Sequence, residues 1–479
     1  MGILLCFSCF KALAQVQEWQ WAESGNGNSA ESVASVVTDT SGNIYVTGYF
    51  NSDSIFFGDT LLVSHGNDDI FLVCYDTYGN VVWAKCFGST ENDYSSYMAV
   101  DNSVNIYMIG YFGSDTIFFG SEMLISEGYD DIFLVKILSD GSVVWGKSFG
   151  GSDYDWGLGI ACDNDDNVYI TGLFDSDTLS FNSDTFYNAG SDDVFVAKLD
   201  NSGNVIWAKS AGSSQADVGT RLKTNTVGEV FLSGYFRSSY IVLGSDTLYN
   251  SGGSDPFIAK LNSSGNFLWA NSLKGNDNDF IRGLAVSDAD EIFMDGSFFS
   301  DTLSIGTALL ANHGGNDVFL TKFDATGNML WAKSTGGTDW DLAMGIALDT
   351  FDNVYICGHF RSPSIVFGTT TLTNSGASNI FLVKYGINGN PEWAKKAGGT
   401  YSDAASDIAT DVMGNIYLTG DYSSGTIAFG SSTLDNSGFS DVYLAKMISE
   451  YNEIPGNGNE GLSFNQKNSS RLCLGVKIC

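Results

Sequence analysis

The fold is decided by a stretch that recurs along the chain. Residues 69–112 read DIFLVCYDTYGNVVWAKCFGSTENDYSSYMAVDNSVNIYMIGYF. The tryptophan in this stretch belongs to a series that repeats every 62 residues without insertion or deletion: Trp21, Trp83, Trp145, Trp207, Trp269, Trp331 and Trp393. A fixed period of this length indicates a repeat architecture, in which each unit is one supersecondary structure.

Each repeat contains four short apolar runs. In the quoted stretch they are residues 69–73, 81–85, 98–101 and 106–108. They are rich in β-branched and aromatic residues and are bounded by Gly, Asn, Asp or Ser, which is typical of strands. No window has a sustained helical period, so the sequence predicts four strands per repeat and essentially no helix.

Short turns join the runs in pairs. Residues 39–43 and 76–80 both combine an Asp with a Gly-Asn pair. Asp can accept a hydrogen bond from the backbone two residues on, and Gly supplies the positive φ of a tight hairpin. We therefore expect antiparallel neighbours.

The arrangement of the repeats follows from burial and from the chain ends. Runs such as 69–73 are apolar at nearly every position, so both of their faces must be covered. The first repeat is preceded by an extra strand at residues 17–23, whereas the last repeat stops at residues 441–446 without a fourth strand. In a linear array these would be unpaired edges, but in a ring they complete one blade. The sequence predicts an all-β, seven-bladed β-propeller with four antiparallel strands per 62-residue blade, the last blade closed by the N-terminal strand.

The recurring pattern resembles a known family. Asp-Ile/Val-Phe-Leu-Val-Lys is followed by Asp-x-x-Gly-Asn-x-x-Trp-Ala-Lys and then by Asp-x-x-Gly-Asn-Ile-Tyr-x-Thr-Gly. This looks like the bacterial seven-bladed β-propeller repeat, the SBBP type, and the resemblance covers about residues 15–447. It implies a secreted or surface protein without a common reaction, and it supplies no catalytic residues. Asn225, Asn271 and Ser287 depart from the pattern.

The chain is expected to have three parts. Residues 1–14 are typical of a secretory signal peptide, because an apolar stretch precedes the small-x-small sequence Ala12-Leu13-Ala14. Residues 15–447 form the propeller, in which residues 17–23 complete blade 7. Residues 448–479 are a Gly/Asn-rich linker and a short unstructured tail. We therefore predict a secreted or cell-surface location, a monomer and no membrane span.

The charge balance excludes several partners. The chain has 56 acidic and 22 basic residues, a net charge of −34. Such a charge argues against binding to nucleic acid or to an anionic membrane. The expected partner is an extracellular polysaccharide or a surface protein, bound on the rim that carries the longer connections, here called the long-loop rim. The alternative is that these connections only widen the blades.

Five basic residues in repeats four and five break the pattern of the other repeats. Lys223 replaces a small residue on the innermost predicted strand, and the other four map to the long-loop rim. Arginine suits carboxylate or sulfate because its donors form a planar fork. The sequence predicts an anion-binding patch near the channel mouth, where three arginines approach one another; the alternative is pairing with Asp217, Asp277 or Asp279. The candidate residues are Arg221, Lys223, Arg237, Lys274 and Arg282.

An acidic residue also recurs before the innermost strand of every repeat. Because this residue has the same place in every repeat, we expect a structural role. It can cap loop N–H groups or pair with a lysine in the column of Lys85, that is, at the position that Lys85 has in its repeat. The members are Glu31, Asp93, Asp155, Asp217, Asp279, Asp341 and Asp403. A calcium loop at residues 163–167 is the less favoured interpretation of a hairpin turn, because it lacks the glycine and the later acid of such loops.

Catalysis and metal binding are not expected. The three histidines are isolated in sequence, and Cys74, Cys86, Cys162 and Cys357 lie singly on predicted strands. We therefore predict no catalytic residue, no cofactor, no disulfide framework and no zinc site, and interpret the chain as a binding scaffold. The alternative is a glycan-directed hydrolase or lyase, which a cluster of acid, base and Arg in the channel mouth would favour.

Overall fold

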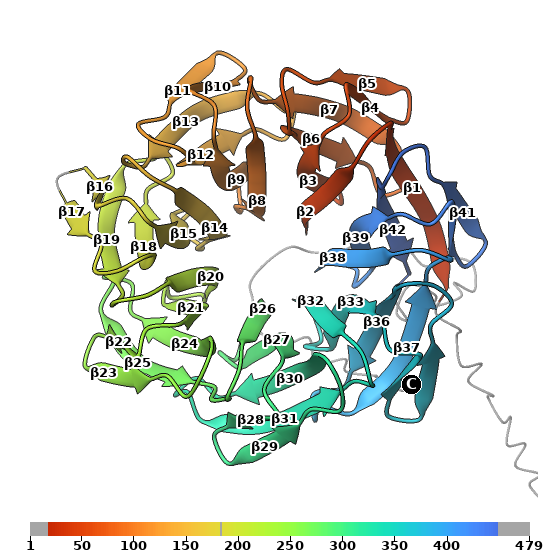
Figure 1. Ribbon diagram of the computed structural model, residues 1–479. Helices are drawn as coiled ribbons and strands as arrows, with labels where there is room; N and C mark the ends of the chain where they lie inside the picture. The colour runs from red at the N-terminus through yellow and green to blue at the C-terminus, as the bar shows by residue number, and fades with distance from the viewer. Residues whose placement is uncertain (1–17, 183, 449–479) are drawn as a thin grey trace, which may run out of the picture.

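The computed structural model describes residues 18–182 and 184–448. They form a closed ring of seven sheets around an axial channel (Figure 1), and all of their regular elements are strands. None of the described residues belongs to a helix long and apolar enough to cross a membrane. The predicted signal peptide at residues 1–14 and the tail beyond residue 448 lie outside the described residues.

In blades 1–6 the four antiparallel strands follow sequence order from the channel outward. Blades 1–3 consist of β2 (Glu31–Thr38), β3 (Ile44–Phe50), β6 (Asp69–Tyr75) and β7 (Val81–Phe87); β8 (Asp93–Val100), β9 (Ile106–Phe112), β12 (Asp131–Ile137) and β13 (Val143–Phe149); and β14 (Asp155–Cys162), β15 (Val168–Phe174), β18 (Asp193–Leu199) and β19 (Val205–Ala211). Blades 4–6 consist of β20 (Asp217–Thr224), β21 (Val230–Phe236), β24 (Asp255–Leu261) and β25 (Phe267–Ser272); β26 (Asp279–Val286), β27 (Ile292–Phe298), β30 (Asp317–Phe323) and β31 (Met329–Thr335); and β32 (Asp341–Leu348), β33 (Val354–Phe360), β36 (Asn379–Tyr385) and β37 (Pro391–Ala397).

Blade 7 confirms the predicted ring closure. It consists of β38 (Asp403–Thr410), β39 (Ile416–Tyr422), β42 (Asp441–Met447) and, as its outer strand, β1 (Trp19–Gly27). β1 runs antiparallel to β42, with Trp21 opposite Lys446 and Gly25 opposite Val442. The closing strand begins and ends later than the predicted 17–23, because its last three residues also pair with the next hairpin, β4, where Gly25 faces Phe57.

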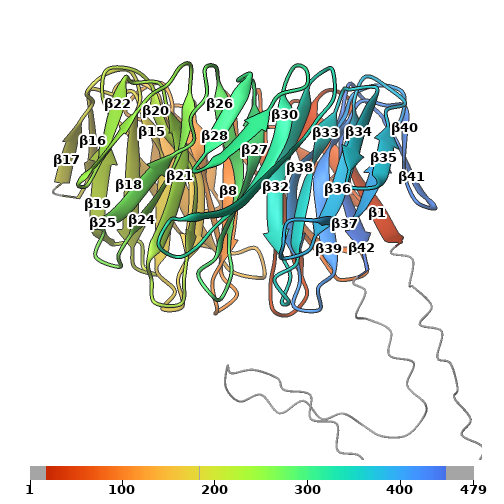
Figure 2. The same cartoon turned by 90° about the horizontal axis from the view of Figure 1, so that it is seen from below.

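The connection between the second and third strands of every blade is a small hairpin. The hairpins are β4 (Ser54–Phe57) with β5 (Thr60–Val63), β10 (Thr116–Phe119) with β11 (Glu122–Ile125), β16 (Thr178–Phe181) with β17 (Asp184–Tyr187), β22 (Tyr240–Leu243) with β23 (Asp246–Tyr249), β28 (Thr302–Ile305) with β29 (Ala308–Ala311), β34 (Ser364–Phe367) with β35 (Thr370–Thr373), and β40 (Thr426–Phe429) with β41 (Ser432–Asp435). They lie at the circumference of the ring in Figure 1, and β22, β28 and β34 lie nearer one rim in Figure 2. Because they fold outward, they do not cover the innermost strands at the centre of the ring.

Apolar clusters between neighbouring blades hold the ring together. Between blades 1 and 2, Leu72 packs with Met108 and Phe133, and the hairpin residues Ile117 and Phe119 complete the same cluster. Within each blade, a glycine in the second strand lets that strand lie close to the innermost strand. At Gly48 an added Cβ would lie 2.0 Å from the backbone oxygen of Ser32. The hairpins therefore seal the outer edge of each interface, which explains their recurring apolar positions.

Candidate functional site

The recurring acidic residues are structural, as predicted. Each is the first residue of an innermost strand and is fully buried. Asp217 accepts hydrogen bonds from the backbone N–H of Ser213 and from the Ser238 hydroxyl, both at 2.8 Å. All seven carboxylates accept a bond from a serine hydroxyl in this way, and the serines are Ser52, Ser114, Ser176, Ser238, Ser300, Ser362 and Ser424. Within the described residues none of these carboxylates forms an ion pair with a lysine, so capping is confirmed and the Lys85 column is not involved.

The tryptophan column joins one blade to the next. Trp207 on β19 donates its indole N–H to the backbone oxygen of Ser263 at 3.0 Å, in the outer turn of blade 4. Its ring is half-buried and lies 6.0 Å from that of Tyr169. Five further tryptophans make the same bond: Trp21, Trp83, Trp145, Trp269 and Trp331. The column therefore belongs to the scaffold and not to a ligand platform.

The predicted basic residues of blades 4 and 5 divide into two groups. Arg237 and Lys274 are exposed on the long-loop rim. Arg237 lines a groove of 720 Å³ on the rim of blade 4, to which Asn278 contributes from the connection to blade 5. Lys274 lines an adjacent hollow of 350 Å³ that shares Ser251 with the groove. The groove is lined by Gln215, Arg237, Ser239, Asn250, Ser251, Gly252, Gly253 and Asn278, so it contains amide, hydroxyl and guanidinium groups but no carboxylate.

Aromatic rings connect this groove to the channel. The Arg237 guanidinium lies 5.9 Å from the ring of Tyr235, which meets Phe280 edge to face at 5.1 Å. On the other side of Phe280 lies the guanidinium of Arg282, at 5.3 Å. Among the described residues neither arginine has a carboxylate within ion-pair distance, so the predicted pairing with Asp217, Asp277 or Asp279 is absent. Arg237 instead donates through its Nε to the Ser254 hydroxyl at 2.9 Å.

The approach of Arg221, Arg237 and Arg282 on the long-loop rim stays a prediction, and the structure shows only an electrostatic influence of Arg221 on Arg282. Desolvation in the channel, followed by the charge of Arg221, lowers the pKa of Arg282, although solvent still reaches its guanidinium. Arg221 lies deeper. Its guanidinium covers the ring of Tyr97 at 4.4 Å and donates to the backbone oxygen of Thr220 at 2.9 Å, while its buried Nε has no hydrogen-bond partner.

Acidic residues that the sequence analysis missed face Arg221 in the channel. Tyr97 donates to a carboxylate oxygen of Asp407 at 3.2 Å, and the other oxygen accepts from the backbone N–H of Val36 at 2.9 Å. Asp295 is completely buried beside this layer. Burial raises the pKa of Asp295 to about 7, although Arg221 favours its charged form. Tyr97, Arg221 and Asp407 come from blades 2, 4 and 7, so their contacts cross the channel.

A chamber of 390 Å³ lies on the far side of this layer, toward the short turns. All seven blades line it, mainly with apolar residues such as Ile160, Ile346 and Ile408. Lys223 is the one basic residue of its lining. Burial lowers the pKa of Lys223, and the carboxylate of Asp407 partly offsets this shift. Lys223 is thus separated from the rim groove that holds Arg237.

The residues 163–167 form an internally bonded turn. One oxygen of Asp163 accepts from the backbone N–H of Asn167 at 2.9 Å, and the other accepts from the Tyr169 hydroxyl at 2.9 Å. Lys198 pairs with the same carboxylate at 3.2 Å. Because protein donors use both oxygens, the hairpin interpretation of this segment is supported over a calcium loop.

Comparisons with known proteins find a WD-repeat relative but show no family. No family model matches it. An uncharacterized WD repeat-containing protein of Acanthamoeba polyphaga mimivirus is 26% identical over an alignment that covers 93% of this chain and 40% of that protein. The regulatory protein FlaEY of Caulobacter vibrioides is 30% identical over 32% of this chain and 16% of its own length. The chain thus spans less than half the length of these relatives. The WD40 domain of Neurospora crassa Pan2 aligns with 86% of this chain and 88% of its own, at 10% identity and a TM-score of 0.42. The chain is a seven-bladed β-propeller with a WD-repeat relative along nearly its whole length.

Proposed function

We propose that this protein is a secreted or cell-surface binding scaffold of the SBBP type, and that it holds an acidic polysaccharide on the long-loop rim of blades 4 and 5. The observation that carries the proposal is the rim groove around Arg237. In a chain with a net charge of −34, this groove has a guanidinium, three amide side chains and no carboxylate. The WD-repeat relative supports a binding role in general terms.

The geometry favours an extended ligand. From the groove, the series Arg237, Tyr235, Phe280 and Arg282 leads toward the channel mouth. Guanidinium groups bind carboxylate or sulfate through paired donors, and aromatic faces between them supply apolar contact area. A polysaccharide with an acidic group on successive sugars can use both kinds of contact at once. A compact anion would reach only one arginine.

Binding of a uronic-acid oligosaccharide to the purified chain tests the proposal. We expect Arg237→Ala and Arg282→Ala each to weaken binding by roughly 10-fold to 100-fold, because each removes a charge-assisted contact. Wild-type affinity should fall as salt is raised, and less steeply in the variants. Lys333→Ala is the matched control, since Lys333 is exposed on outer strand β31 away from the groove. Equal affinity of the wild type and all three variants would refute the proposal. Tighter binding of an acidic peptide than of the oligosaccharide would indicate that the ligand is a protein.

A glycan-directed hydrolase or lyase is the second candidate. Its support is the convergence of Tyr97, Arg221 and Asp407 in the channel, with Asp295 beside them. A carboxyl whose pKa is raised to about 7 is suited to proton transfer near neutral pH. Two of the polar groups are already bonded to each other, since Tyr97 donates to Asp407. Release of new chain ends from an acidic polysaccharide, abolished in Tyr97→Phe, would establish this candidate over simple binding.

A further inference from the structure

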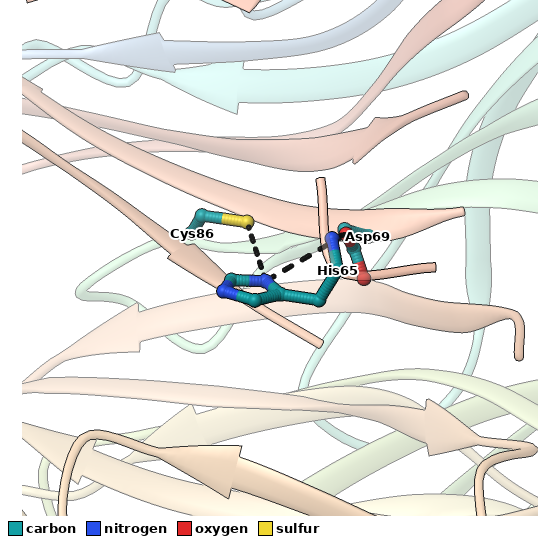
Figure 3. Close-up of side chains that lie close together, drawn as sticks. All are labelled: His65, Asp69 and Cys86. Atoms are coloured by element: carbon teal, nitrogen blue, oxygen red, sulfur yellow. Dashed lines mark hydrogen bonds and ion pairs between the residues drawn. The ribbon is translucent and has the colours of Figure 1, made fainter. Parts of the chain in front are cut away.

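Blade 1 contains a cluster of three potential metal ligands outside the regions described above. His65 lies between β5 and β6, Asp69 is the first residue of β6, and Cys86 lies on the outer strand β7. Figure 3 shows the His65 ring between the other two side chains. Its Nδ1 is 3.5 Å from the sulfur of Cys86 and 3.8 Å from a carboxylate oxygen of Asp69. The three ligand atoms all lie within 4.8 Å of one another.

The repeat supplies an internal comparison for this cluster. Four blades further on, the same positions hold His313, Asp317 and Ser334. There the imidazole Nδ1 makes a direct contact of 2.7 Å with the carboxylate. In blade 1 a cysteine replaces the serine. The imidazole nitrogen there lies further from the carboxylate than in blade 5, at similar distances from the carboxylate oxygen and the sulfur. Blade 5 thus has a His–Asp hydrogen bond, whereas in blade 1 the same imidazole nitrogen forms a hydrogen bond with Cys86 and a longer ion pair with Asp69.

The distance of 3.5 Å between the Cys86 sulfur and the His65 nitrogen matches that of two ligands around one ion, and the Asp69 oxygen lies slightly further away at 3.8 Å. For tetrahedral zinc, the usual metal–sulfur and metal–nitrogen bond lengths place sulfur and nitrogen ~3.5 Å apart. The side chain of His65 is 55% exposed, which leaves the outer side of the cluster open to water. Thiolate, imidazole and carboxylate together suit Zn²⁺, and hard cations such as Mg²⁺ or Ca²⁺ do not bind through sulfur.

We propose that His65, Asp69 and Cys86 form a Zn²⁺ site in which three protein ligands leave one coordination position for water or an incoming ligand atom. The ion would join the loop after β5 to strand β7, and so would tie together the third and fourth strands of blade 1. Binding requires the thiol to lose its proton to solvent and involves no redox change. Cys86 occupies a column that Ser148, Ser210, Ser272 and Ser334 fill elsewhere, so the fold itself does not need a thiol there.

Titration of the full untagged chain with Co²⁺ tests this site, because cobalt replaces zinc and reports its ligands by absorption. We expect a sulfur-to-cobalt charge-transfer band and tetrahedral d–d bands that Zn²⁺ abolishes. Cys86→Ser should lose the charge-transfer band, and His65→Ala should weaken cobalt binding by at least about 100-fold. Cys74→Ser, which removes a buried thiol of the same blade, is the matched control. No thiolate band in the wild-type chain, or an unchanged band in Cys86→Ser, would overturn the proposal.

A gain-of-site variant separates this interpretation from a general effect of cysteine. Ser334→Cys gives blade 5 the same three residues as blade 1. In the Cys86→Ser background it should restore the cobalt–thiolate band with one equivalent of metal. Both variants should stay folded, since other blades have serine at this position and blade 1 has cysteine, and circular dichroism checks this. A folded double variant that gives no band would show that the residue set is not sufficient and would count against the site.

Discussion

Two sets of buried carboxylates differ in their hydrogen bonding. One set lies at the start of the innermost strands, and the other lies near Arg221 in the channel and includes Asp295. Asp217 accepts bonds from Ser213 and Ser238, and equivalent bonds recur around the ring. Asp295 is equally buried, yet neither of its oxygens has a hydrogen-bond partner among the described residues, although the backbone N–H of Gly283 lies close enough to favour its charge. Positions that all blades share thus hold the ring together. Asp295, where one blade departs from the others, is by contrast a polar group without such a bond in the described part of the chain.

The largest expected effect concerns the strand that all blades depend on for closure. Deleting residues 19–27 removes β1 and leaves β42 as an exposed apolar edge. We expect aggregation, because an unpaired edge of this kind pairs with other chains. Light scattering and size-exclusion chromatography measure it, and a synthetic peptide of residues 19–27 should restore a soluble ring. A soluble deletion variant of unchanged melting temperature would contradict the closure argument.

Removal of one shared carboxylate should have the next largest effect. Asp217→Ala leaves the Ser213 N–H and the Ser238 hydroxyl buried without their acceptor. We expect the free energy of unfolding to fall by about 3–5 kcal/mol, since each unsatisfied buried group costs about 1–3 kcal/mol. Urea denaturation gives this value. A loss below about 1 kcal/mol would show that water replaces the carboxylate.

The tryptophan column offers a test of similar kind but smaller size. Trp207→Ala removes a half-buried ring and its bond to the Ser263 carbonyl. Because the ring is only partly buried, we expect a loss of about 2–4 kcal/mol, below the usual cost for a core aromatic. Denaturant unfolding and glycan binding should be measured together. Full stability with loss of binding would reassign the column to the ligand.

The smallest expected effect has the opposite sign. Asp295→Thr restores the residue that Thr47, Thr171 and Thr419 provide elsewhere. Because burial raises the folded pKa of Asp295 to about 7 from 3.8, the folded state binds its proton more tightly than the unfolded state. The stability that this group contributes below about pH 4 is therefore lost as the pH rises from about 4 to about 7. We expect the variant to be more stable by about 1–3 kcal/mol at pH 8 and to show a weaker decline across this window. An unchanged pH profile would show that Asp295 is already neutralised.

The sequence predicts the ring well because the residues that define blades and strands recur at a fixed spacing. The 62-residue spacing of Trp21 through Trp393 gives seven blades, and the apolar runs give the strands. The sequence predicts the closing strand at residues 17–23, whereas β1 covers Trp19–Gly27. The difference arises from its pairing with β4, a contact between the last blade and the first hairpin that no local pattern reveals.

The candidate site is predicted less completely. Arg221, Arg237 and Arg282 stand out because each breaks a column of the repeat. Their acidic and aromatic partners were missed, because Tyr97 and Asp407 meet only across the channel, 310 positions apart. The sequence does contain a signal for this contact, because Tyr97, Arg221 and Asp407 share one position of the repeat. At that position glycines in some blades leave space that large side chains from other blades can fill. The residues are Ser35, Tyr97, Gly159, Arg221, Gly283, Gly345 and Asp407. His65 and Cys86 were likewise considered one at a time.

The double pairing of β1 has a consequence for the order of folding during synthesis. Its partner in β42 is 417 positions away, from Gly25 to Val442, so that ladder cannot form until nearly the whole ring has left the ribosome. Its other partner, Phe57 on β4, is made shortly after β1 itself. Blade 1 can therefore hold β1 in place early in synthesis. β42 is made last and then pairs with the free edge of β1, which is already positioned. Weakening the β1–β4 contact should slow ring closure in refolding experiments more than it lowers the final stability.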